Sequence, residues 1–274
     1  TAAAVRAATL RGQSAVAQAP SPGQEASTAA HAAAPEDVLV LPRSVKGRPL
    51  VRVGVRALPY APASLVVADT VRVIGRDNAC RGTRRLALPE GLEAIGAHCF
   101  CSRVLEGPVP IPASVRSIGE GSFEYAVCRL EHTGTVVHVS ADQLLTCFLT
   151  DAPDGVPFDY ARYDELLRSG KNLPDRLGAV QHRLTVPYRL EDTTRAALVA
   201  YLREHEREAQ QRVAQEGERA MVEALVRDGF IDNRTFERQI ELLRACNRTD
   251  CVLYLMEQHR EQARPSSARE RFAL

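Results

Sequence analysis

Two stretches of the chain repeat each other at an offset of 23 residues, and this repeat constrains the fold more than any other feature. Residues 88–100 and 111–123 match at six of 13 positions, and every match is a Gly, a Pro or a large apolar residue. The matched pairs are Leu88/Ile111, Pro89/Pro112, Leu92/Val115, Ile95/Ile118, Gly96/Gly119 and Phe100/Phe123. A period of this length is typical of solenoids, in which stacked units share one continuous core.

Further copies of the repeat lie upstream. An offset of 21 places Val67, Val71, Ile74, Gly75 and Ala79 over Leu88, Leu92, Ile95, Gly96 and Phe100, and a first copy begins at Leu41-Pro42. Four copies therefore cover most of residues 38–128, and the valines at 136, 137 and 139 indicate a closing strand.

Each copy has residue types that suit one coil of a solenoid. Proline lacks a backbone N–H and holds its predecessor extended, so the Leu-Pro or Ile-Pro step is expected to end a short strand. Leu92 and Ile95 are expected to fill the interior of a coil, and Gly96 to permit a turn that a side chain would obstruct. Phe100 and Phe123 are expected to plug the next corner.

The motif of Leu-Pro, two residues, Leu or Val, two residues, Ile-Gly, three residues and Phe resembles the BspA-type leucine-rich repeat, a bacterial and protist class. The resemblance is strongest over residues 86–130, and it departs from the family at Ala79, where the family prefers Phe. It implies a curved β-solenoid used for protein recognition, with no catalytic residues to carry over.

The region from about Phe158 to Gln262 has the 3.6-residue apolar period of helices. We expect helices at about 159–170, 174–186, 191–213, 218–228 and 235–246, with a last one from Thr249, and the third of these is expected to be one long helix. Short helices separated by Gly or Asn turns resemble the helix pairs of ankyrin-like arrays.

The sequence thus predicts an α+β fold with the two classes segregated along the chain. Residues 38–150 form a short leucine-rich-repeat β-solenoid, and residues 151–274 form an all-α helical-hairpin domain. Residues 1–37 are rich in alanine and contain the breaker cluster Pro20-Ser21-Pro22-Gly23, which indicates a linker or weak helix. A transit peptide is the alternative for this segment.

Composition narrows the classes of partner. Lys and Arg number 35 against 34 Asp and Glu, and the charges interleave along the helical region, so we expect no nucleic-acid partner. No apolar run reaches the roughly 18 to 20 residues that span a bilayer, so no membrane insertion is expected. Seven dispersed cysteines fit free thiols in a reducing compartment, which favours the cytoplasm; the cell surface stays open.

Candidate chemistry in the sequence is sparse. His98, Cys99 and Cys101 are the densest set of potential metal ligands, but they have no second pair at matching spacing. Cys99 aligns with Ser122, which favours a buried small side chain over a metal or redox site. No phosphate loop or nucleophile motif occurs, and the sequence predicts no cofactor and no catalytic residues.

The leading hypothesis is a non-catalytic recognition or adaptor protein whose exposed strand face binds a protein partner, with an acidic patch as a suitable target. The candidate binding residues are Arg84, Arg85, Ala87 and Val109, which are expected to be exposed. Two alternatives stay open. One is a hydrolase or modifying enzyme that uses His132, His138 and Cys147, and the other is a structural subunit of a larger assembly. The sequence does not predict the oligomeric state.

Overall fold

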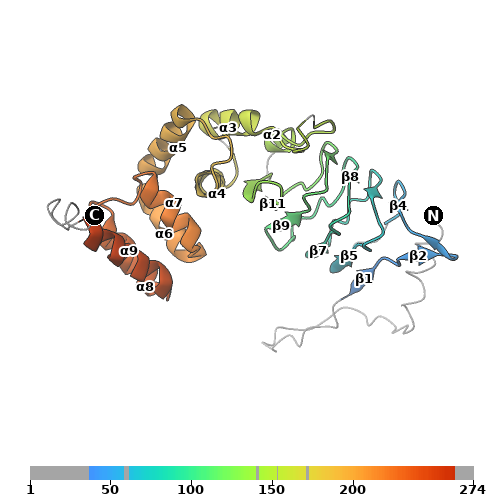
Figure 1. Cartoon of the computed structure of the whole chain (residues 1–274), viewed down its shortest axis with the longest axis horizontal. Helices are drawn as coiled ribbons and strands as arrows, with labels where there is room; N and C mark the ends of the chain where they lie inside the picture. The colour runs from blue at the N-terminus through green and yellow to red at the C-terminus, as the bar shows by residue number, and fades with distance from the viewer. Residues whose placement is uncertain (1–36, 59–61, 140–141, 153, 171–172, 263–274) are drawn as a thin grey trace, which may run out of the picture. The chain divides into compact units, whose positions relative to one another are not determined.

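The computed structural model describes residues 37–58, 62–139, 142–152, 154–170 and 173–262 (Figure 1). The prediction for the alanine-rich segment lies outside these residues, apart from Asp37. The chain divides into two compact units. Unit 1 comprises the residues up to His132 together with His138–Asp159, and unit 2 comprises Thr133–Val137 and the residues from Tyr160 onward.

Unit 1 is a parallel β-solenoid of short strands, as the repeat predicts (Figure 1). Successive coils contribute one strand each to two parallel sheets, ordered β1-β5-β7 and β4-β6-β8-β10, and β9 pairs with β11 in a further parallel ladder. Strands β2 and β3 form an antiparallel hairpin within the first coil. The bounds are β1 Val38–Val40, β2 Ser44–Val45, β3 Arg48–Pro49, β4 Arg52–Val53, β5 Ser64–Val66, β6 Val73–Ile74, β7 Arg85–Ala87, β8 Ala94–Ile95, β9 Val109–Ile111, β10 Ser117–Ile118 and β11 Val127–Leu130.

Large apolar residues of the repeat fill the interior of the coils. Leu92, Ile95, Val115 and Ile118 are each at most 1% exposed, which confirms their predicted place. The plug residues form a row of rings: Phe100 lies 5.4 Å from Phe123, which lies 6.0 Å from Phe148, which lies 5.4 Å from Phe158. Burial is therefore shared between neighbouring coils, as stacking units require.

A column of glycines sets how closely the coils stack. A Cβ atom on Gly75 would lie 2.8 Å from the carbonyl carbon of Gly54, one on Gly96 would lie 2.7 Å from that of Gly75, and one on Gly119 would lie 2.6 Å from that of Gly96. Backbone atoms cannot move aside cheaply, so these positions exclude any side chain. The sequence interpretation gave Gly96 a role in turning, whereas the structure shows that close approach of the next coil requires it.

A second column of small polar side chains links the coils by hydrogen bonds. Asn78 Nδ2 donates to the Gly54 carbonyl at 2.9 Å, Cys99 Sγ to the Gly75 carbonyl at 3.2 Å, and Ser122 Oγ to the Gly96 carbonyl at 2.7 Å. We call Asn78, Cys99 and Ser122 the donor column. Each donates to a half-buried glycine carbonyl of the preceding coil, so the expected burial of Cys99 is confirmed, and this hydrogen bond gives a reason for it.

Unit 2 is helical, and the described helices after the solenoid lie close to the predicted ranges. The long helix expected at 191–213 is wrong, because the chain breaks at His205 (φ −114°, ψ 33°) into two helices. The bounds are α3 Tyr160–Ser169, α4 Arg176–Thr185, α5 Asp192–Glu204, α6 Glu206–Glu216, α7 Arg219–Arg227, α8 Phe236–Ala245 and α9 Thr249–Gln262; strand β12 (Thr135–His138) also lies mostly in this unit, and the short α2 (Asp142–Leu145) lies in unit 1.

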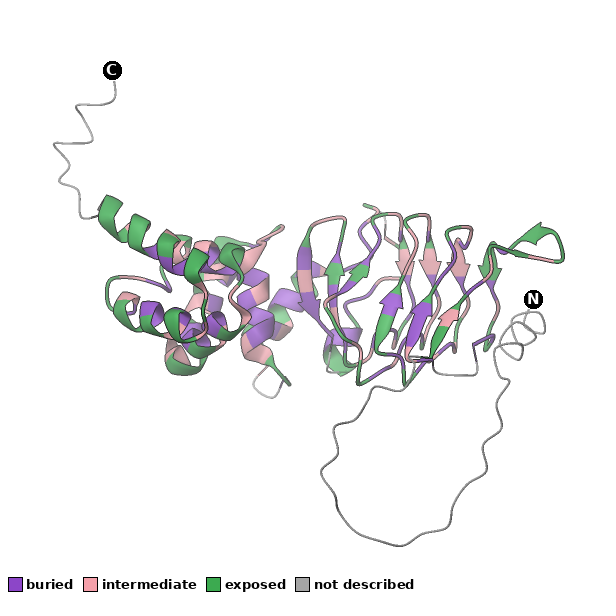
Figure 2. Ribbon diagram, turned by 90° about the horizontal axis from the view of Figure 1, so that it is seen from below, coloured by how far each residue is buried: buried purple, intermediate pink, exposed green. Residues whose placement is uncertain are grey.

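The helices carry a repeat that the sequence reading did not detect. Gln181, Gln210 and Gln239 are spaced by 29 residues on α4, α6 and α8, and all three are fully buried. Gln181 donates to the Ala209 carbonyl at 2.8 Å, and Gln239 donates to the Gln210 carbonyl at 3.3 Å. Helix α4 packs on α6, and α6 packs on α8, so unit 2 is an array of stacked helix pairs (Figure 1). Figure 2 shows that these helices carry both buried and exposed residues, as amphipathic helices do.

Candidate functional site

Strand alternation divides the β1-β5-β7 sheet into an inner and an outer side. Leu39, Leu65 and Leu86 are register partners that point inward, and Leu65 is fully buried. The residues on either side of each leucine therefore point outward. We call these outward positions the outer strand face: Val38, Val40, Ser64, Val66, Arg85 and Ala87.

The outer strand face is largely apolar. Val40, Val66 and Ala87 are direct register partners on three successive coils, and they form one row across the sheet. Val40 is 60% exposed and Val66 is 36% exposed, while Ala87 is also exposed. Parallel strands stack at about 4.8 Å, so the row presents three apolar side chains within about 10 Å.

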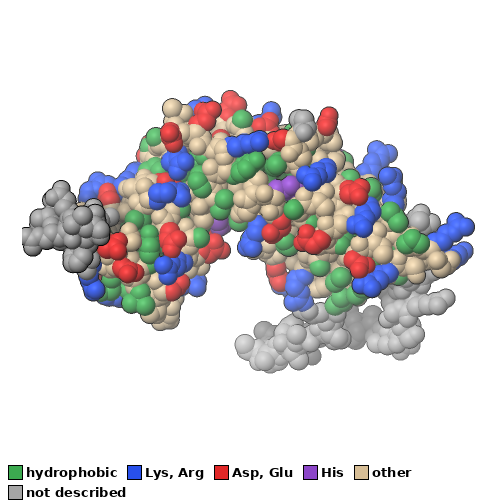
Figure 3. All heavy atoms as spheres, viewed as in Figure 1, with side chains coloured by type: hydrophobic (Ala, Val, Ile, Leu, Met, Phe, Trp, Pro, Cys, Tyr) green, Lys and Arg blue, Asp and Glu red, His purple; other side chains and the backbone are tan. Residues whose placement is uncertain are grey.

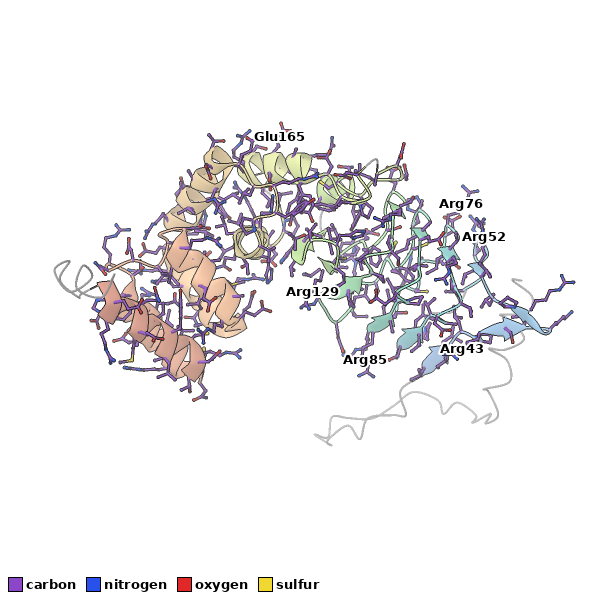
Figure 4. The ribbon with its side chains drawn as sticks, viewed as in Figure 1. Arg43, Arg52, Arg76, Arg85, Arg129 and Glu165 are labelled. Carbon is purple, nitrogen blue, oxygen red and sulfur yellow. The ribbon has the colours of Figure 1, made fainter. Side chains whose placement is uncertain are left out.

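Arginines are the only charged residues on the solenoid strands near this row. Strands β1, β5, β7, β9 and β11 contain Arg85 and Arg129 and no acidic residue (Figure 4). The Arg85 Nε donates to Ser64 Oγ at 3.2 Å, which holds the arginine along the outer strand face. Arg84, just before β7, pairs with Glu106 at 3.3 Å, and both side chains are exposed.

The structure separates the four predicted binding residues. Arg84, Arg85 and Ala87 are exposed, and the last two lie on the outer strand face. Val109 is 2% exposed, so the expectation that it faces solvent is wrong. In the offset of 23 that relates the two best copies, Val109 corresponds to the inward Leu86, and the exposed residue of β9 is Pro110.

Residues beyond the predicted set also contribute. Val40 and Val66 were missed because a valine in a short strand gives no sign of the side it faces until the register is known. Arg129 pairs in register with Pro110 and extends the arginine-bearing side of the strands. Pro108 and Pro110 lack N–H groups, which explains why β9 does not join the ladder of β7.

The surroundings of the cysteines in unit 1 indicate a structural role for these thiols. Burial, followed by the nearby Cys99 sulfur, raises the pKa of Cys80 to about 12, and burial raises the pKa of Cys99 to about 11. Cys101 Sγ donates to the Gly121 carbonyl at 3.2 Å, and the His98 side chain is exposed. Thiols in such surroundings stay protonated at neutral pH and are poor nucleophiles.

The residues of the enzymatic alternative lie near the end of the solenoid sequence. His132 is half-buried, and its pKa is lowered, chiefly by burial and secondly by Arg116. His138 is 2% exposed and Cys147 is fully buried. Among the described residues, neither ring nitrogen of His132 has a hydrogen-bond partner, so His132 itself forms no hydrogen-bonded catalytic pair with His138 or Cys147.

Comparisons with known proteins give one similar structure. No family model matches the chain, and no curated protein matches it. A crystal structure of a leucine-rich-repeat protein of T. pallidum, TpLRR, is 26% identical over 33% of this chain and 55% of that chain, with a TM-score of 0.24. The chain thus matches about half the length of that protein, and the leucine-rich-repeat-like fold of unit 1 rests on its own repeat and strand register.

Proposed function

We propose that this chain is a non-catalytic recognition module of the BspA-type leucine-rich-repeat class, which binds a protein partner through the outer strand face. The observation that carries the proposal is the exposed apolar row of Val40, Val66 and Ala87. Isolated exposed apolar residues are ordinary, but a row on one rigid sheet is a feature of binding surfaces.

The arginines define the chemistry of the partner. Arg85 and Arg129 lie on the strands, and these strands carry no acidic residue. A guanidinium group binds carboxylates in a planar, bidentate manner, so an apolar surface with acidic residues at its edge is the complementary partner. The cysteines Cys80, Cys99 and Cys128 are free thiols, which supports a reducing compartment, and we propose that this interaction takes place in the cytoplasm.

Unit 2 is proposed to be an adaptor array attached to this module. The stacking of α4, α6 and α8 at a 29-residue spacing supports an array of helix pairs, which resembles ankyrin arrays in the stacking of short helices. Among the described residues, no helix combines the length and apolarity that crossing a bilayer requires.

Affinity capture from the source organism with the tagged full chain tests the strand-face proposal. Ala87→Glu adds bulk and negative charge at the β7 end of the apolar row, and we expect it to lose the captured partner. Val104 is 50% exposed and lies outside the outer strand face, so Val104→Glu is the matched control and should retain the partner. Retention of every partner by Ala87→Glu would overturn the proposal, as would capture of all partners through unit 2 alone.

A further inference from the structure

The first coil, residues 37–58, is the end of the stack among the described coils. Strands β1 and β4 are the outermost strands of their two parallel sheets. The glycine column also indicates that the first coil is at the end of the stack. A Cβ on Gly54 would contact only Ala57 of its own coil, at 3.8 Å, whereas a Cβ on each later glycine of the column would collide with the backbone of the preceding coil. In the part of the chain that the structure describes, no strand pairs with the outer backbone edge of this coil.

This end of the solenoid is unusually apolar for an exposed edge. Val38, Val40, Val51 and Val55 are 49%, 60%, 46% and 51% exposed, and all four belong to the first coil. Proteins usually protect the ends of repeat stacks with polar residues and blunt exposed strand edges, because such edges pair with other chains. The four exposed valines of the first coil therefore leave this end without a continuous polar cover.

The same coil carries a strong positive charge. It contains five cations and one acid, so its net charge of +4 exceeds that of the whole chain, +1. Arg43 pairs with Asp69 and Arg56 with Asp77, both in the second coil, whereas Lys46, Arg48 and Arg52 have no ion pair among the described residues. Figure 3 shows blue side chains gathered where the β2–β3 hairpin projects, and Figure 4 labels Arg43 and Arg52 at this end.

We propose that the free edge of β1 binds an extended, acidic segment of a partner protein by strand addition. Asp37 accepts from the Ser64 N–H at 3.0 Å, and Leu41 donates to the Val66 carbonyl at 2.9 Å. In a parallel ladder, alternate residues face the same neighbour, so the N–H and C=O groups of Val38 and Val40 point to the open side. These groups can pair with an added strand.

Charge decides between the possible occupants of this edge. A second copy of the chain would bring another first coil of charge +4 against the first, and like charges oppose that pairing. An extended segment with carboxylates and apolar residues satisfies the cations, the valines and the backbone edge together. This inference concerns a main-chain edge and does not rest on the proposed role of the outer strand face.

A synthetic peptide tests the proposal with the full chain. The probe is a labelled six-residue peptide of alternating valine and glutamate with blocked ends, and its reference replaces each glutamate by lysine. We expect saturable binding of the glutamate peptide that weakens as salt rises, and binding of the lysine peptide at least tenfold weaker. Equal binding of the two peptides would overturn the proposal.

Variants of Val40 test the main-chain contact. Val40→Pro removes an N–H that the ladder with β5 does not use, and Val40→Thr keeps the donor and the branched shape. We expect at least tenfold weaker peptide binding for Val40→Pro and less than about twofold change for Val40→Thr, with unchanged circular dichroism for both. Ala87→Glu should also leave peptide binding within about twofold, which separates this site from the outer strand face.

Two further outcomes would contradict the proposal. The pair Lys46→Glu and Arg48→Glu lies on the exposed hairpin and leaves the coil interior intact, so undiminished peptide binding by this double variant would overturn it. Sedimentation velocity supplies the other outcome. A dimer of the wild-type chain that dissociates in Val40→Pro would show that a second copy occupies the edge.

Discussion

Gly96 lies where the backbone of the preceding coil leaves no room for a methyl group. A Cβ atom there would come within 2.7 Å of the Gly75 carbonyl carbon, and the coils would have to separate to admit it. We expect Gly96→Ala to lower the free energy of unfolding of the solenoid by about 1–3 kcal/mol, the usual cost of overpacking. Urea denaturation followed by circular dichroism measures this change.

Gly54 is the matched control, because it belongs to the same glycine column but has no preceding coil among the described residues. Its added Cβ would make only an ordinary contact with Ala57 at 3.8 Å. Gly54→Ala should therefore change stability little, within about 0.5 kcal/mol. Equal losses in the two variants would show that close coil approach is not what selects glycine.

At single residues, the sequence predicts burial better than exposure. The repeat correctly places Leu92 and Ile95 inside the coils, because large apolar residues that recur at the same position of every copy fill the shared core of a solenoid. The sequence prediction that Val109 is exposed is wrong, because alternate residues of a strand face the same side and Val109 shares the buried side of β9 with Ile111. The sequence does not reveal the donor column, because Asn78, Cys99 and Ser122 have different side chains and share only their position relative to the glycine of the preceding coil.

Helix α3 and helix α4 are joined by a buried ion pair. Arg183 is fully buried, and its guanidinium donates to both carboxylate oxygens of Asp164, at 2.6 and 2.9 Å. We expect Asp164→Ala to destabilise unit 2 by about 3–5 kcal/mol, because the variant leaves a buried charge without its partner. Thermal and urea unfolding monitored by helical circular dichroism measure the loss.

An exposed ion pair in the same unit provides the comparison. Asp192 lies 3.7 Å from Arg195 and its side chain is 99% exposed. Asp192→Ala should cost at most about 1 kcal/mol, since solvent screens such pairs. If Asp164→Ala were no worse than Asp192→Ala, the Arg183 pair would have no structural role.

At the scale of elements, the sequence predicts the helices and misses what happens between them. Apolar periodicity places most helix ends within a few residues, because that period reports one buried face. The break at His205 was missed, since the apolar positions of α5 and α6 continue one period across it. There, the His205 ring lies 4.4 Å from the Tyr201 ring at an interplanar angle of 41°, and its Nδ1 lies 3.0 Å from the Tyr201 carbonyl oxygen.

Over the whole molecule, the cysteines report how tightly each unit is packed. Cys101 in unit 1 and Cys246 in unit 2 are half-exposed, and the other five cysteines are buried. Under native conditions at pH 8, we expect a thiol reagent to modify Cys101 and Cys246 first, and the buried set only on unfolding. Mass spectrometry of the labelled peptides identifies the sites, and early labelling of Cys99 or Cys128 would contradict the packing described.

The donor column makes the coil, rather than the residue, the unit that can be exchanged. Asn78, Cys99 and Ser122 each donate to the glycine carbonyl at the equivalent position of the preceding coil, so the coils that they join share the same attachment points. Removing one whole coil would bring a donor-column side chain next to an equivalent glycine carbonyl and preserve the hydrogen bond at the junction. The length of such a solenoid can therefore change in steps of one coil, and each new junction would use the same hydrogen bond between neighbouring coils.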